Sequence, residues 1–228
     1  MLAGQMVGLR RRKHAVLLAV LLVALAVETF HAQSGAERLR WYALRTVLGI
    51  AIWIVVFERP RERTAMAAAL LASLAIDWGS YFTATSLDYA LSVADQVVLL
   101  LFLWSAVYVI LRDLFRTVAG GAQNVLGAIC GYLIAGSAWA HMNAIAYLLV
   151  PSAYSINPEV AGLLPDWHGR TALFTYYAFA QVMTMGYSDV TPVHAPATTL
   201  SLFASLFGVF YTAVVVSQFV GLAQKPKR

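Results

Sequence analysis

The sequence contains six apolar stretches that each approach or exceed the ~20 residues needed to cross a lipid bilayer. They lie at 14–32, 41–57, 65–85, 90–111, 123–150 and 197–223. Hydrophobic residues make up 61% of the chain, charged residues only 12%, and the mean hydropathy is +0.71. Soluble domains carry about 25% charged residues. The pattern therefore predicts an all-α membrane protein with six transmembrane helices, and it excludes soluble, disordered, collagen-like, coiled-coil and disulfide-rich secreted classes.

The first stretch has two interpretations. Arg10–Lys13 followed by the apolar run Ala15–Val27 is also typical of a cleaved signal peptide. Cleavage after Ala32 would place the bulky Phe30 at a position that prefers small residues. We therefore expect a retained helix, with cleavage as the alternative.

The basic residues give the orientation of the helices. If the N-terminus lies inside, 12 of the 16 Lys and Arg residues fall on the inner side. Only Arg38, Arg40, Arg45 and Arg170 fall on the outer side. Because inner loops are enriched in Lys and Arg, we expect a multi-pass protein of the cell membrane with both termini in the cytoplasm.

Segment 151–196, between the last two apolar stretches, is too long for a simple turn and too polar to span. It begins with a Pro- and Gly-containing stretch, Pro151–Arg170. Thr171 is a suitable cap for a helix of about 12 residues that ends near Met183. Such a helix reaches halfway into a membrane, so we expect a re-entrant helix followed by a loop.

The loop, Thr184-Met185-Gly186-Tyr187-Ser188-Asp189, resembles the selectivity filter of the potassium channel pore family, whose usual form is Thr-Val-Gly-Tyr-Gly-Asp. The pair Tyr176-Tyr177 stands where that family commonly has Trp-Trp, and Pro192 follows the loop as it often does there. Gly208 matches the gating-hinge glycine of the inner helix. The resemblance covers 123–223.

The resemblance implies a homotetramer in which each chain supplies a quarter of a ring around K⁺, the permeant ion, with no cofactor. Backbone carbonyls replace the hydration shell of the ion. Those carbonyls would belong to Thr184, Met185, Gly186 and Tyr187, and the Thr184 hydroxyl would complete the innermost site. The C-terminal end of the half-helix would favour a cation in the cavity below.

Several positions depart from the family pattern. Met185 replaces Val or Ile, and its side chain is expected to pack behind the filter. Ser188 replaces the second glycine, which leaves K⁺-selective and non-selective monovalent cation conduction both open. In relatives, Asp189 accepts a hydrogen bond from the pore helix, and Tyr177 is the expected donor here, since Ala180 occupies the position where many prokaryotic relatives have Glu.

Two groups of residues near the filter have competing interpretations. Glu159, Asp166 and Asp189 are either an acidic outer mouth that concentrates cations or, for the first two, solvated loop charges. The inner helix carries a stripe, defined as Val209, Thr212, Val216 and Val220, which lies on one helical face. This stripe either lines the cavity, with Val216 and Val220 as a hydrophobic gate, or packs against the fifth helix. Gly208 is either a hinge or a close-packing residue.

The first four helices (1–116) precede a pore domain (117–223) and a short basic cytoplasmic tail (224–228). Between Val97 and Ile110 the fourth helix has no basic residue, so we do not expect conventional voltage sensing. Charges within these helices form a candidate cluster: Glu28, Arg45, Asp77 and Asp95. Arg45 is expected to pair with Asp77 or Asp95, in either a proton- or voltage-sensing group or a structural polar cluster.

Other classes of function are less well supported. Ser137 and His141 lie on one helix, whereas an intramembrane serine protease needs them on different helices, so we expect no enzyme. His141 is expected to be a packed or hydrogen-bonded helix residue. A potassium transporter carries four filter-like repeats in one chain, and this chain has one. A non-conducting accessory subunit remains an alternative. The sequence has no motif for nucleotide, phosphate or calcium binding and no pattern typical of nucleic-acid binding. Because it therefore shows no site for a soluble regulator, the candidates for opening the pore are lipid, tension and a separate regulatory partner.

Overall fold

The computed structural model describes residues 13–31, 38–83, 89–116, 122–164, 167–186 and 189–223. These residues are mostly helical, which confirms the predicted α class. The helices are α2 (Lys13–His31), α3 (Arg38–Val56), α4 (Pro60–Thr83), α5 (Tyr89–Arg116), α6 (Ala122–Leu149), α7 (Trp167–Val182) and α8 (Ala195–Ala223). Each predicted apolar stretch coincides with one long helix.

Three helices are long and apolar enough to span a membrane by length and composition: Val93–Arg116, Gln123–Leu149 and Ala195–Val220. The apolar parts of α2 and α3 are shorter, Lys13–Val27 and Trp41–Val56. Helix α4 begins with Pro60, a favoured first helical residue, and carries charged residues in its first turn. The protein is thus a helical membrane protein with at least these three candidate spans.

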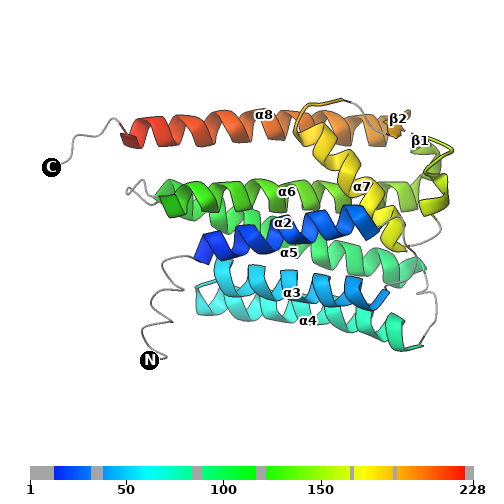
Figure 1. Ribbon diagram of the computed structural model, residues 1–228, viewed down its shortest axis with the longest axis horizontal. Coiled ribbons are helices and arrows are strands. Elements are labelled where there is room, and N and C mark those ends of the chain that lie inside the picture. The colour runs from blue at the N-terminus through cyan, green and yellow to red at the C-terminus, as the bar shows by residue number, and fades with distance from the viewer. Residues whose placement is uncertain are drawn as a thin grey trace.

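The long helices run side by side in alternating directions (Figure 1). Helices α3 and α4 lie on one side of the bundle and α8 on the other, with α6 beside α8. Helix α7 crosses obliquely and packs against both α6 and α8. The start of α2 and the end of α8 lie at the same end of the bundle.

The connection between α6 and α7 is ordered by a small sheet that the sequence did not predict. It contains the 3-10 turns η1 (Pro151–Ala153) and η2 (Ala161–Leu163) and the strand β1 (Tyr154–Ile156). Strand β1 pairs antiparallel with β2 (Val190–Pro192), which follows the filter-like loop, so that Ser155 faces Thr191. The two ends of segment 151–196 are therefore joined.

Ion pairs close the opposite end of the bundle. Lys13 Nζ at the start of α2 lies 2.5 Å from Glu58 Oε1, just after α3. Arg112 near the end of α5 binds both carboxylate oxygens of Glu62 in the first turn of α4, at 2.5 and 3.2 Å. These pairs bring the ends of consecutive helices together.

Candidate functional site: the half-length helix and the loop that follows it

Helix α7 is a 16-residue helix held by apolar contacts on both sides. Phe174 and Tyr177 are fully buried against Tyr154 of β1, and Ala178 and Val182 pack in a cluster with α6 and α8. The helix begins at Trp167, so the prediction that Thr171 caps it was wrong. Gly169, between Trp167 and Thr171, does not stop the helix, because tertiary packing outweighs its weak helix propensity.

The last turn of α7 holds the start of the loop. The amide of Thr184 donates to Gln181 O at 2.9 Å, and the amide of Met185 donates to Ala180 O at 2.8 Å. Thr184 has a φ of +56° and Gly186 a φ of +74°, whereas Met185 between them is not positive. Residues with a Cβ rarely adopt such angles, so Thr184 is held there by these hydrogen bonds. Gly186 thus has a backbone angle that glycine adopts readily.

The loop is exposed within one chain. Met183, Thr184, Met185 and Gly186 are all exposed, and the Met185 side chain is 51% accessible. The prediction that Met185 packs behind the loop therefore does not hold within a single chain. Tyr187 and Ser188 lie outside the described residues.

The two tyrosines of α7 have different environments. Tyr176 is 40% exposed, whereas Tyr177 is fully buried and its hydroxyl contacts the Ser201 hydroxyl of α8. The expectation that Tyr177 donates to Asp189 was therefore wrong. Ser201 is buried nearly two turns into α8, where the phenol of Tyr177 reaches it from α7.

Asp189 is instead held by Asn157, a residue that sequence reasoning missed. Asn157 Nδ2 donates to Asp189 Oδ1 at 3.0 Å, and the Asn157 amide donates to Asp189 O at 2.8 Å. The β1–β2 pairing continues directly into these bonds. The only local signal is the turn-forming pair Asn157-Pro158, which indicates a turn but not its partner.

The proposed acidic mouth is described only in part. Glu159 is exposed and its amide donates to Asn157 Oδ1 at 3.1 Å. This turn places Glu159 beside the residue that binds Asp189. Asp166 lies outside the described residues.

Helix α8 approaches the end of α7 very closely at Gly208. A Cβ built on Gly208 would lie 1.9 Å from Val182 O, a distance that no real Cβ tolerates. Ser205 Oγ donates to Gln181 O at 3.1 Å, and Tyr132 Oη of α6 donates to Val182 O at 3.1 Å. Gly208 therefore serves close packing, and α8 is continuous through it.

The stripe on α8 does not pack against α6. Val209, Val216 and Val220 are 54%, 54% and 51% exposed, and Thr212 is exposed as well. The Thr212 hydroxyl donates to Gly208 O within its own helix at 2.9 Å. Packing against the fifth helix is thus wrong, and the stripe faces away from the chain.

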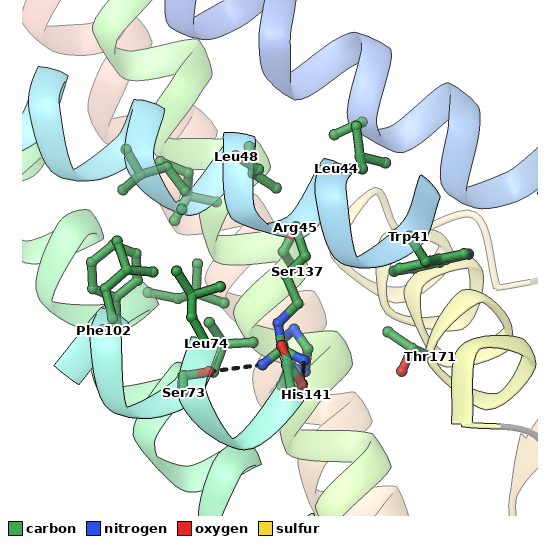
Figure 2. Close-up of a pocket in the computed structure, with 18 of the residues that line it drawn as sticks. Trp41, Leu44, Arg45, Leu48, Ser73, Leu74, Phe102, Ser137, His141 and Thr171 are labelled. Carbon is green, nitrogen blue, oxygen red and sulfur yellow. Dashed lines mark hydrogen bonds and ion pairs between the residues drawn. The ribbon is translucent and has the colours of Figure 1, made fainter. Parts of the chain in front are cut away.

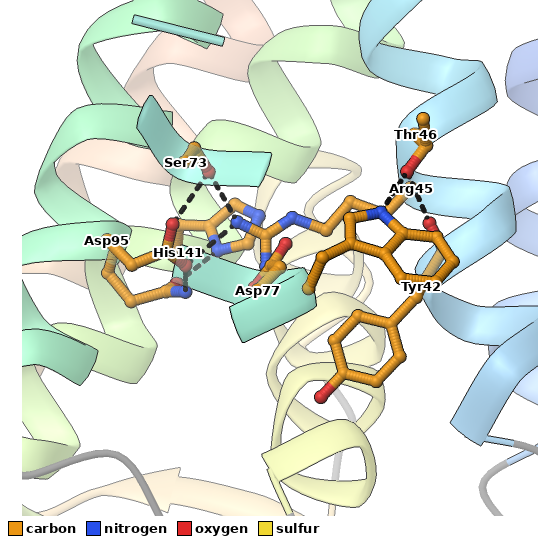
Figure 3. A network of polar contacts seen from close by, with 9 residues as sticks. Tyr42, Arg45, Thr46, Ser73, Asp77, Asp95 and His141 are labelled. Carbon is orange, nitrogen blue, oxygen red and sulfur yellow. Dashed lines mark hydrogen bonds and ion pairs between the residues drawn. The ribbon is translucent and has the colours of Figure 1, made fainter. Parts of the chain in front are cut away.

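Arg45 joins both predicted acidic partners rather than one (Figure 3). Its Nη1 lies 2.8 Å from Asp77 Oδ1 and its Nη2 lies 2.8 Å from Asp95 Oδ2. Ser73 bridges the two, since it accepts from Arg45 Nη2 at 2.9 Å and donates to Asp95 Oδ1 at 2.6 Å. The side chain of Glu28, the fourth predicted member, lies outside the described residues.

This cluster continues to α6. Gln96 Nε2 donates to Asp95 Oδ2 at 3.4 Å, and Gln96 Oε1 lies 2.5 Å from His141 Nδ1. The expectation of a hydrogen-bonded His141 is confirmed. Ser137 donates to Leu133 O in its own helix, at 3.3 Å. Both side chains are thus engaged by groups other than each other.

A cavity of about 80 Å³ lies beside the cluster and is lined by residues of α2, α3, α4, α5, α6 and α7 (Figure 2). Arg45, Ser73, Asp77 and His141 form its polar wall, and leucines and Phe102 line much of the rest. Thr171 and Thr175 of α7 also face it. The cavity therefore touches both the four-helix part of the chain and the half-length helix.

Comparisons of the chain with protein-family models, with curated proteins and with solved structures found no match. The assignment of function consequently rests on the residues and their geometry.

Proposed function

We propose that four copies of this chain form a cation channel that conducts K⁺ through a ring of backbone carbonyls at 184–187. The observation that carries this proposal is the exposed loop after the half-length helix α7, whose residues Thr184–Asp189 resemble a potassium-channel filter. The amides of Thr184 and Met185 donate back to α7 in a common C-terminal cap, in which the residue just past the helix has a positive φ. Beyond this cap Gly186 has a φ of +74°, an angle that glycine adopts readily and that would let the carbonyls of the loop turn toward one axis.

The carbonyl oxygens of the loop support the same function. Within the part of the chain that the structure describes, no hydrogen bond reaches the carbonyl oxygens of Thr184, Met185 and Gly186. Their lone pairs are available for a dehydrated cation.

The exposure of the loop favours a tetramer. Irregular backbone at membrane depth is tolerated only when it is buried in protein or lines a water-filled path. Met183–Gly186 and the α8 stripe are both exposed in one chain. Neighbouring copies around a central axis would cover the apolar side chains and leave the carbonyls facing water and ions.

The arrangement of the bundle supports a placement in the membrane. We propose that all six long helices span the plasma membrane and that α7 re-enters it from outside. Support comes from the shared end of α2 and α8, which agrees with two cytoplasmic termini (Figure 1). The two aspartates that pair with Arg45 hold its side chain in place, which favours a non-voltage-sensing four-helix part and no catalytic role.

The proposal is tested by ion flux from K⁺-loaded liposomes that contain the purified protein. Gly186→Ala should abolish flux, because a Cβ at φ +74° costs about 1–2 kcal/mol per subunit and turns the carbonyl. Gly162→Ala, where a Cβ meets nothing within 4 Å, is the matched control and should conduct normally. Flux that survives Gly186→Ala would refute the carbonyl filter. Equal flux from Na⁺-loaded liposomes would favour the non-selective alternative.

A further inference from the structure

The buried charges beside the cavity do not balance among the described residues. Arg45 carries one positive charge, and it is paired with two carboxylates, Asp77 and Asp95. Their side chains are 7% and 3% exposed. His141, the other titratable side chain of this wall, contacts the Gln96 amide and not a carboxylate. An uncompensated charge inside a membrane protein is costly, so a further cationic partner is expected.

Two atoms of the cluster are left without a partner, Arg45 Nε and Asp77 Oδ2. Asp77 is 5% exposed, and its Oδ2 forms no hydrogen bond, although Oδ1 binds Arg45 at 2.8 Å. Asp77 lines the cavity, as does the Ser137 hydroxyl, which donates to Leu133 O and keeps lone pairs. The hydroxyls of Thr171 and Thr175 add oxygen atoms from α7.

We propose that this cavity binds one monovalent metal ion, Na⁺ or K⁺, at Asp77 Oδ2. Its volume of about 80 Å³ has room for an ion together with water, since one water needs roughly 10–15 Å³ by such a measure. Protonation of Asp77 would also remove the excess negative charge, but it would need neither the volume of the cavity nor the hydroxyl oxygens that line it. The ion would neutralise the cluster and connect α4 to the pore helix α7.

A divalent ion does not fit the same wall. Ca²⁺ and Mg²⁺ prefer several carboxylate or carbonyl ligands. Within the described part of the chain, no group of three or more His, Cys, Asp or Glu residues is placed to hold a metal. The single unbalanced charge matches one monovalent ion.

The test is the unfolding temperature of the purified protein in detergent, followed by tryptophan fluorescence at pH 8. N-methylglucamine chloride is replaced stepwise by NaCl or by KCl at constant ionic strength. We expect saturable stabilisation by about 3 °C or more, and the ion with the lower half-saturating concentration identifies the ligand. Asp77→Asn should remove this dependence. Asp113→Asn, which alters another Arg-paired carboxylate far from the cavity, should retain it.

Two further variants distinguish loss of the ion site from misfolding and from loss of the channel. Ser137→Ala should raise the half-saturating concentration about tenfold and fold normally, which covers the case that Asp77→Asn does not fold. Thr184→Ala alters the proposed filter and should leave the Asp77-dependent stabilisation unchanged. The ion site at Asp77 is therefore tested separately from the channel. Unfolding temperatures that do not respond to Na⁺ and K⁺, that respond to pH alone, or that keep their ion dependence in Asp77→Asn would overturn the proposal.

Discussion

The Arg45 cluster (Arg45, Ser73, Asp77 and Asp95) and the face formed by α8 with the loop after α7 differ in whether their groups have partners within the chain. In the cluster, nearly every polar atom has a partner from another helix of the same chain. On the other face, the valines of the stripe and the backbone of Met183–Gly186 stay exposed. The first region finds most of its partners within one chain, whereas the second would be covered by neighbouring copies in the proposed tetramer.

This difference separates two kinds of constraint in one membrane protein. In the four-helix part, Arg45 has acidic partners within the chain because lipid penalises an unpaired charge. In the proposed channel, the face formed by α8 and the loop keeps its carbonyls without partners because the permeant ion would bind them. Substitutions should therefore affect folding of the chain in the first region and assembly or conduction in the second.

The largest effect is expected from Arg45→Met. This variant leaves two buried carboxylates without their cation and should lower the free energy of unfolding by about 3–5 kcal/mol. Denaturant titration in detergent micelles measures the change. Adding Asp77→Asn and Asp95→Asn to the same chain removes both charges and should restore most of the loss. If Arg45→Met alone is as stable as the natural chain, the cluster is not structural.

Gly208→Ala should have the next largest effect. The new Cβ would overlap Val182 O, so α8 must move away from α7, at a cost of about 1–3 kcal/mol. Thermal unfolding and the fraction of tetramer on size-exclusion chromatography report the change. Gly79→Ala is the control, because that helical Cβ meets nothing within 4 Å. Equal behaviour of the two variants would contradict the close α7–α8 contact.

Asn157→Ala should destabilise the outer end of the filter loop with little effect on the fold. The Asp189 carboxylate loses a hydrogen bond worth about 1.5–3 kcal/mol. Channel currents should then run down faster, or lose K⁺ preference, in bilayer recordings. Tyr177→Phe removes the hydroxyl that contacts Ser201 and should not cause this change in the currents. The reverse pattern would indicate that Tyr177 is the partner of Asp189 after all.

The smallest effect is expected from Glu62→Gln, at the end of the bundle where Arg112 pairs with Glu62. The hydrogen bond from Arg112 holds the pKa of Glu62 below its usual value. A carboxylate with a lowered pKa stabilises the fold above its unfolded pKa and loses this contribution as pH falls. Glu62→Gln should therefore cost at most about 1 kcal/mol near pH 7, and the difference should shrink as pH falls and the carboxylate becomes protonated. A difference that grows on acidification would contradict the pair.

Much of the architecture could be predicted from the sequence because lipid leaves few alternatives. Apolar length places six helices within a few residues of those observed, as with 123–150 and Ala122–Leu149. The likeness of Thr184–Asp189 to a filter marked the exposed loop in which Gly186 has a positive φ. Burial of Arg45 with acids on neighbouring helices indicated a pair.

The contacts across segment 151–196 could not be predicted. Asn157 and Asp189 meet because β1 and β2 pair, and three-residue strands have no sequence period to reveal them. The Tyr177–Ser201 contact depends on how α7 crosses α8, which no local pattern specifies. The start of α7 at Trp167 was missed because packing extends the helix through residues of weak helix propensity.

The most direct test of the central claim, a K⁺-conducting filter, is the reversal potential of the purified protein in a planar bilayer. K⁺ on one side and Na⁺ on the other give opposed gradients, and Ba²⁺ block and Ser188→Gly are measured in parallel. The account predicts currents that reverse close to the K⁺ equilibrium potential and are blocked by Ba²⁺. A reversal potential near zero, or no current from tetrameric protein, would contradict it.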